Sequence, residues 1–292
     1  VNGNNLVDFT NENEFHQSPE GNYSKRTFAQ GWQSVQFTIW TFVFLFMALV
    51  MMVVRDLGYM MRIRLLTDEQ LSWRQSFRVI MIWEFASAMT PGIVGGAAVA
   101  MFILNREGIN LGKSTAIVLI TALLDKLFYI FIVTLTILLA GTSVLFPENI
   151  STAFLGITFN PFTLFFIAFS IIVLIVIFLL LAIFIAPYWF KNFLLFFCRL
   201  FFLKRFRDRI AKTGDDIITA SKEFKGKTIK FWWQVFGATM LSWMGRFLVI
   251  NCLILAFAPM ADQLFVFARQ LSMWVILLIS PTPGGSGIAE FA

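Results

Sequence analysis

Residues 83–105 read WEFASAMTPGIVGGAAVAMFILN, and this stretch decides the fold because it is an apolar run with a break in its middle. Thr90-Pro91-Gly92 divides the apolar segment 77–104 into a piece of about 13 residues and a piece of about 12. Proline lacks a backbone N–H and glycine is conformationally free, so a helix is expected to stop here. At about 1.5 Å per residue each piece spans about 20 Å, too short for a hydrocarbon core of about 30 Å. The pattern favours two half-length helices.

The composition around this break is that of an integral membrane protein. Of the 292 residues, 58% are hydrophobic and 14% are charged, whereas about 25% are charged in an ordinary soluble domain. A shorter apolar run covers 264–280. Four longer apolar runs could cross a bilayer as helices: 35–54, 114–140, 161–186 and 231–257. We therefore predict an all-α fold, a polytopic transmembrane helical bundle.

The loop charges predict how these segments are oriented. Residues 187–230 contain eleven Lys or Arg against four acids, and basic loops lie on the cytoplasmic side. Counting crossings back from this basic cytoplasmic loop places 141–160 outside and 105–113 inside. The arginine-rich connector 55–76 also falls inside if the segment 77–104 enters and leaves on one side, as a re-entrant hairpin that turns at its break.

A second break, Thr282-Pro283-Gly284, follows the short apolar run that begins near Leu264. The same counting makes this segment a second re-entrant hairpin, which enters from the opposite face, so that the two tips meet inside the membrane. Opposed broken helices are a recurring transporter design. The 192 residues between the breaks are compatible with an inverted repeat. The alternative is two proline kinks in ordinary spanning helices.

The two ends of the chain differ from its body. Residues 1–31 are polar and acidic, and we expect them to form an extracytoplasmic N-terminal segment. A transmembrane domain is expected over 32–292, with the basic loop inside it. The chain opens on Val1 without Met and stops at Ala292, shortly after the second break. We therefore expect a fragment that lacks sequence at both ends, with the transmembrane domain incomplete at its C-terminal end.

The two breaks are the predicted binding site. A helix begins just after each one, so its free N–H groups and the positive end of its dipole would attract an anion inside the membrane. Glycines leave little side chain between a ligand and these groups, although they could equally serve close helix packing. The candidate tip residues are Thr90, Pro91, Gly92, Gly95 and Gly96 in the first break and Thr282, Pro283, Gly284, Gly285, Ser286 and Gly287 in the second.

Charged residues within the apolar runs are the other candidates, because each costs about 2.5 to 3.5 kcal/mol in hydrocarbon. Arg246 and Arg269 could hold a phosphate, since a guanidinium presents several donors to its oxygens. The alternative is that Arg246 pairs with Glu84, Asp125 or Glu290 and only stabilises the packing of the bundle. The remaining charges in this set are Glu84, Asp125, Lys126 and Glu290.

The sequence argues against the chemistry of soluble enzymes. His16, the single histidine, lies in the polar N-terminal segment, and Cys198 and Cys252 have no CxxC spacing. No catalytic residue, metal site or cofactor is therefore predicted, and the chain is not expected to be an enzyme. The basic residues lie between apolar runs, where anionic lipid head groups meet them and nucleic acid does not. We expect membrane lipids as partners, and the sequence leaves a homo-oligomer open.

Three stretches resemble a known family: WEFASAMTPGIVGGAAVAMFILNREGINLGKSTAIVLITALLD at 83–125, LSWMGRFLVIN at 241–251 and RQLSMWVILLISPTPGGSGIAEF at 269–291. They resemble the flippase-like integral membrane family related to the lysylphosphatidylglycerol synthase transmembrane region, and PTPGGSGIAEF is the most specific part. The resemblance implies a multi-pass protein of the bacterial inner membrane that translocates lipid. It does not imply aminoacyl transfer, because the soluble synthase domain of the fused members has no counterpart here. Lys126 stands where the family pattern leads us to expect an acid beside Asp125.

Three functions remain open. The first is a lipid flippase or lipid transporter that binds an anionic or phosphate-bearing head group between the two tips. The second is a secondary transporter of a small solute or ion, which would need a closed aqueous cavity at the tips. The third is a non-catalytic membrane scaffold subunit, in which the intramembrane charges all pair with one another.

Overall fold

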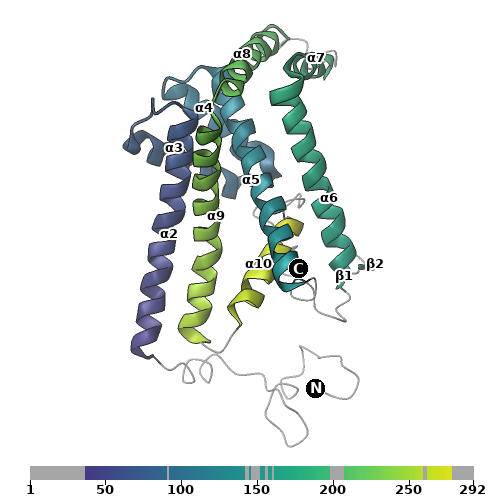
Figure 1. Ribbon diagram of the computed structural model, residues 1–292. Helices are drawn as coiled ribbons and strands as arrows, with labels where there is room; N and C mark the ends of the chain where they lie inside the picture. The colour runs from purple at the N-terminus through teal and green to yellow at the C-terminus, as the bar shows by residue number, and fades with distance from the viewer. Residues whose placement is uncertain are drawn as a thin grey trace, which may run out of the picture.

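The fold is a bundle of helices, seen in a computed structural model that describes residues 37–90, 92–141, 145, 152–154, 157–159, 161–197, 207–258 and 262–277 (Figure 1). Four helices are long and apolar enough to cross a membrane. They are α2 (Ile39–Leu66), α5 (Leu111–Ala140), α9 (Ile229–Phe257), and α6 (Pro161–Leu180) with its π-helical continuation η2 (Leu181–Ile185). These helices match the four predicted crossings, so the predicted all-α transmembrane bundle is confirmed.

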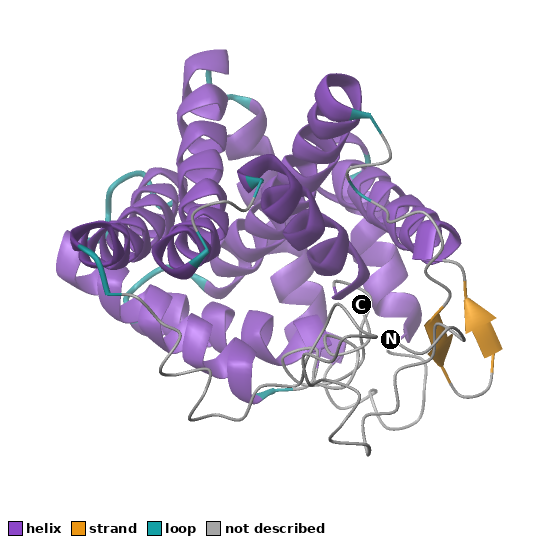
Figure 2. Cartoon of the chain, turned by 90° about the horizontal axis from the view of Figure 1, so that it is seen from below, coloured by secondary structure: helices purple, strands orange, loops and turns teal. Residues whose placement is uncertain are grey.

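Five shorter helices complete the described part of the chain. They are α3 (Trp73–Met89), α4 (Gly92–Arg106), α7 (Pro187–Phe197), α8 (Arg207–Lys225) and α10 (Gln263–Leu277). The basic segment predicted as a loop thus contains the helices α7 and α8. One short antiparallel pair of strands, β1 (Thr152–Phe154) and β2 (Ile157–Phe159), lies at the edge of the bundle (Figure 2).

The first break turns the chain back on itself. The side chain of Gln75 near the start of α3 donates to Glu107, just past the end of α4, over 3.0 Å. Arg78 forms an ion pair with Glu107 at 2.9 Å. In one continuous helix Gln75 and Glu107 would lie about 48 Å apart. The alternative of a proline-kinked spanning helix is therefore wrong at this break, and α3 and α4 form a hairpin. Its entry into the membrane stays a prediction.

The two arms of this hairpin touch near the tip. A Cβ placed on Gly96 would lie 2.0 Å from the Oγ of Ser87 and 3.0 Å from its Cβ. Only a residue without a side chain allows this approach. For Gly96 the structure therefore shows the packing role that was the alternative to anion binding.

A group of charged residues joins three segments at one end of the bundle, which we call the charged end. Lys113, at the start of α5, forms ion pairs with Asp68 at 3.0 Å and Glu223 at 2.7 Å. Lys227, before α9, also pairs with Asp68. Burial acts to raise the pKa of Asp68, but the hydrogen bonds from Lys227 and Lys113 outweigh it and lower the pKa to about 2. The segments 55–76, 105–113 and 187–230 therefore meet at one end, as their charges predicted.

Helix α2 extends further than its apolar run. The segment from Arg55 onward was expected to be an interfacial connector, but the helix continues to Leu66. Arg62 is only 5% exposed. The charges are accommodated because α2 packs closely on α9: a Cβ on Gly58 would lie 2.7 Å from the backbone nitrogen of Ser242. Close contact between small residues brings partners from other helices within reach of the α2 arginines.

The two largest of four buried clusters in the described residues meet along α5. The cluster nearer the charged end includes Leu66, Leu104 and Leu124. The other is rich in aromatic residues and includes Phe128 and Phe247. The polar residues of the candidate site lie where the two clusters adjoin, since Asp125 follows Leu124 directly in α5.

Candidate functional site

The structure describes one of the two predicted tips. Pro91 and the second tip, Thr282, Pro283, Gly284, Gly285, Ser286 and Gly287 with Glu290, lie outside the described residues. Thr90 caps α3, with its hydroxyl donating to the carbonyl of Ala86 over 2.6 Å. Gly92 and Gly95 belong to the first turns of α4. Anion binding at either tip stays a prediction.

Helix α10 precedes the second break in the sequence and begins on the side of the bundle from which the second hairpin was expected to enter. It begins at Gln263, close to the end of α9, and runs back into the bundle (Figure 1). Amide hydrogen bonds hold it there: Asn251 donates to the side chain of Gln263 over 3.0 Å, and Gln270 donates to Asn251 over 2.8 Å. The start of α10 thus lies at the end opposite the charged end.

Asp125 pairs with Arg62, a residue that the sequence reasoning assigned to the connector. The two side chains are 2.5 Å apart, and Arg62 also donates to Thr239 over 3.4 Å. The indole N–H of Trp243 donates to the same oxygen of Asp125 over 2.8 Å. One carboxylate therefore joins α2, α5 and α9.

Glu84 also has a different partner from the one considered for it. It lies 3.6 Å from Arg55, which pairs in addition with Asp56 at 2.8 Å. Arg246 therefore contacts neither Glu84 nor Asp125. Both acids contact arginines of α2 instead, Glu84 from α3 and Asp125 from α5. The third acid considered for Arg246, Glu290, lies outside the described residues, so that pairing stays a prediction.

Arg246 lies over aromatic rings and contacts no carboxylate. Its guanidinium is 4.8 Å from the ring centre of Trp274 and 5.3 Å from that of Trp243. Among the residues that the structure describes, no acid lies within 4.0 Å of it. Glu84 and Asp125 are close enough to act on it electrostatically. Within the described part of the chain, Arg246 is thus a cation that lies over two indoles and contacts no carboxylate.

Tyr129 provides a second uncommitted donor close to Arg246. Its ring is buried and meets Trp243 edge-on at 4.9 Å. Its hydroxyl has no hydrogen-bond partner within the described structure. Buried hydroxyls are normally satisfied, so Tyr129 is a candidate donor to an acceptor group near Arg246.

The other two predicted cations lie apart from this pair of donors. Arg269 lies 4.5 Å over the ring of Phe265, and its buried Nε has no partner in the described part of the chain. No described contact joins Arg269 to Arg246. Lys126 is only 6% exposed, and Asp125 and Arg62 are close enough to act on it electrostatically.

The sequence reasoning missed Arg62, Tyr129, Trp243 and Trp274. Tyr129 could have been found, because it lies four residues after Asp125 and hence on the same face of the helix. Arg62 carried no such signal, since its partner is 63 residues away. For metals, no three His, Cys, Asp or Glu side chains converge among the described residues.

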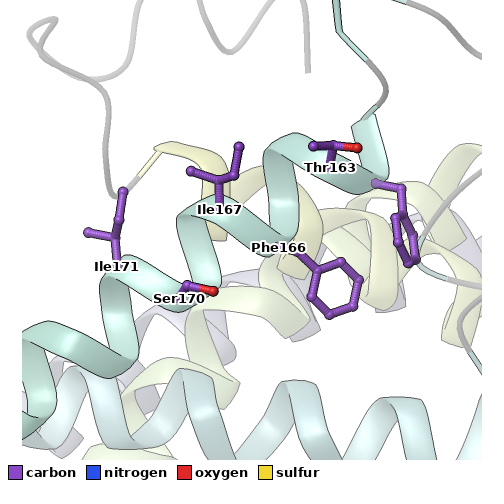
Figure 3. Close-up of a pocket in the computed structure, with 6 residues that line it drawn as sticks. Thr163, Phe166, Ile167, Ser170 and Ile171 are labelled. Atoms are coloured by element: carbon purple, nitrogen blue, oxygen red, sulfur yellow. The ribbon is translucent and has the colours of Figure 1, made fainter.

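A groove of about 450 Å³ runs along the exposed face of α6 (Figure 3). All its lining residues come from the first three turns of this helix and are exposed: Phe162, Thr163, Phe166, Ile167, Ser170 and Ile171. The groove is mostly apolar and opens outward, and no described contact connects it to Arg246.

Comparison with known proteins places the chain in a family. Residues 21–292 match the family described as the lysylphosphatidylglycerol synthase TM region. A UPF0104 membrane protein from Archaeoglobus fulgidus is 23% identical over 270 residues, which cover 89% of this chain and 76% of the relative. No solved structure matches significantly. This multi-pass membrane protein therefore belongs to the family of the lysylphosphatidylglycerol synthase transmembrane region.

Proposed function

We propose that this protein moves lipids across the cytoplasmic membrane, without catalysing a reaction, by holding a phosphate-bearing or otherwise anionic head group at Arg246 between the two tips. The observation that carries the proposal is the guanidinium of Arg246, which lies over Trp243 and Trp274 without a contacting acid among the described residues. A cation in a membrane interior is costly and is normally paired or used.

The surrounding groups favour an anion as the occupant. The neighbouring carboxylates Asp56, Glu84 and Asp125 each already contact an arginine of α2. Arg246 can therefore present its fork of donors to phosphate oxygens. The buried hydroxyl of Tyr129 adds another donor. A phosphate would satisfy both groups at once.

The apolar groove on α6 supports a lipid as the substrate over a small solute. Its residues face outward from a helix long enough to cross the membrane, so acyl chains of the bilayer would adjoin it. A scaffold subunit would have its intramembrane charges mutually paired, and Arg246 contacts no acid among the described residues.

The test is lipid movement in proteoliposomes that contain the purified protein and a trace of fluorescent phosphatidylglycerol. Dithionite added outside bleaches the outer-leaflet probe, and the slow phase reports movement between leaflets. We expect Arg246→Gln to slow this phase at least about tenfold, the loss typical of a charged hydrogen-bonding partner. The rate of Arg246→Lys should lie between those of the wild type and Arg246→Gln, because lysine keeps the positive charge but lacks the paired donors of a guanidinium.

The matched control is Arg78→Gln, which removes an ion pair at the charged end, where the side chain of Arg78 is 54% exposed. It should transport as the wild type does. Equal rates for Arg246→Gln and Arg78→Gln, with both proteins folded, would refute the proposal. Transport of a soluble anion, with no lipid movement, would favour the small-solute alternative.

A further inference from the structure

A line of polar side chains runs along α5 from the charged end toward Arg246. Ser114, Thr121, Asp125 and Tyr129 follow one another at helical spacing and share one face of the helix. Both Thr121 and Tyr129 are buried, and neither hydroxyl has a partner within the described structure. They lie one turn to either side of Asp125, about 6 Å away along the axis. Unpaired hydroxyls on a buried face are rare enough to indicate a route for a polar group.

The Arg62–Asp125 ion pair lies across this line. Arg62 reaches Asp125 from α2, and Thr239 and Trp243 reach the pair from α9. The pair thus joins α2, α5 and α9 at the level between Thr121 and Tyr129. A polar group coming from the charged end would meet it before reaching Tyr129 and Arg246.

We propose that the Arg62–Asp125 ion pair is the inner gate of the Arg246 site, which opens when Arg62 exchanges Asp125 for an arriving anionic group. The exchange replaces one ionic partner of the guanidinium by another and involves no covalent step. The side chain of Arg62 is 6% exposed and that of Asp125 is 20% exposed. A largely buried ion pair suits this role because it is stable while both partners are present and costly when one is missing. The inference adds a gate to the proposed function and is tested without transport.

Trp243 is the positioning residue of this gate. Its N–H holds the Asp125 oxygen that contacts Arg62, while the face of its ring lies under the guanidinium of Arg246. A head group bound at Arg246 and a head group arriving at Arg62 therefore act on the same indole. This shared contact couples occupancy of the site to the state of the gate.

The experiment measures access to the far side of the gate. In a Cys198→Ala and Cys252→Ala background, Tyr129→Cys reports the far side and Thr121→Cys the near side. A membrane-impermeant thiol reagent is applied from the charged end, with orientation fixed in sealed vesicles. We expect Arg62→Gln to raise the labelling rate of Tyr129→Cys about tenfold or more, because loss of one partner of a buried pair strongly disfavours the closed state.

Two further variants separate gating from general loosening of the fold. Arg78→Gln, which removes an ion pair outside the bundle interior, should leave labelling of Tyr129→Cys unchanged. Trp243→Phe keeps an aromatic ring and removes the N–H, and should raise the rate by a smaller factor while thermal unfolding changes little. Equal labelling of Tyr129→Cys with Arg62→Gln and with Arg78→Gln overturns the gate. An unchanged rate with Trp243→Phe overturns its positioning role.

Failure of the gate and failure of the proposed function give different results. If the wild type moves no lipid but labelling still depends on Arg62, the proposed function fails and the gate stands. If lipid movement depends on Arg246 but labelling does not respond to Arg62→Gln, the gate fails and the proposed function stands.

Discussion

Replacing Gly245 by alanine is expected to destabilise the bundle, whereas the same replacement at Gly237 in the same helix is expected to stabilise it. A Cβ on Gly245 would lie 2.9 Å from the backbone nitrogen of Arg55 and 3.0 Å from the carbonyl oxygen of Met51, short of the 3.4 Å at which ordinary contact begins. Because these are backbone atoms, α2 must move away from α9. A Cβ on Gly237 meets nothing within 4 Å.

The magnitudes follow from these contacts. Overpacking costs about 1 to 3 kcal/mol, offset in part by the gain of about 0.5 to 1 kcal/mol when alanine replaces glycine in a helix. We expect a net loss of roughly 1 to 2 kcal/mol for Gly245→Ala and a gain of roughly 0.5 to 1 kcal/mol for Gly237→Ala.

The assay is reversible unfolding in mixed micelles titrated with dodecyl sulfate, followed by tryptophan fluorescence and helical circular dichroism. The wild type and both alanine variants are compared under one lipid-to-detergent ratio. The reasoning fails if Gly245→Ala is as stable as Gly237→Ala, because the close α2–α9 approach would then not exist. That outcome would also remove the packing that brings the α2 arginines to their partners.

The remaining predictions concern the two ends of the bundle and the α9–α10 contact. The folded-state pKa of Asp68 is about 2, below its ordinary 3.8, so its ionised form stabilises the fold above about pH 4, and this stabilisation is lost as the pH falls toward 2. The thermal stability of Asp68→Asn should therefore fall less than that of the wild type between about pH 4 and pH 2. Cysteines at Asn110 and Asp262 should react with an impermeant thiol reagent from opposite sides of the membrane, Asn110 from the cytoplasmic side, and reaction of both from one side would contradict the topology. Gln270→Leu should lower stability in micelles by about 0.6 to 1.7 kcal/mol, because it removes the interhelical hydrogen bond to Asn251; unchanged stability would show that the bond contributes nothing.

Much of the fold could be predicted because a membrane imposes simple requirements. Runs of apolar residues long enough to span marked α2, α5, α6 and α9, and Thr90-Pro91-Gly92 marked the turn between α3 and α4. The loop charges predicted that three segments share one end, and ion pairs such as Lys113 with Asp68 join them there. Each of these features depends on neighbours in the sequence.

The candidate site was predicted only in part. Arg246 and Asp125 were named, because charges in apolar runs stand out from their surroundings. Their partners were not: Asp125 contacts Arg62 of α2, and Arg246 lies over Trp243 and Trp274. Trp274 looked like any other apolar residue of α10, since nothing in a sequence distinguishes a ring that packs in lipid from one that holds a cation.

The sequence by itself determined that this is a multi-pass helical membrane protein, where its helices break and which of its segments share an end. It could do so because hydrophobic length, proline and loop charge act locally along the chain. Only the tertiary structure decided which of the described charges contact one another and which do not. That depends on the close approach of α2 to α9, which places Arg62 beside Asp125 and leaves Arg246 without an acid among its described neighbours.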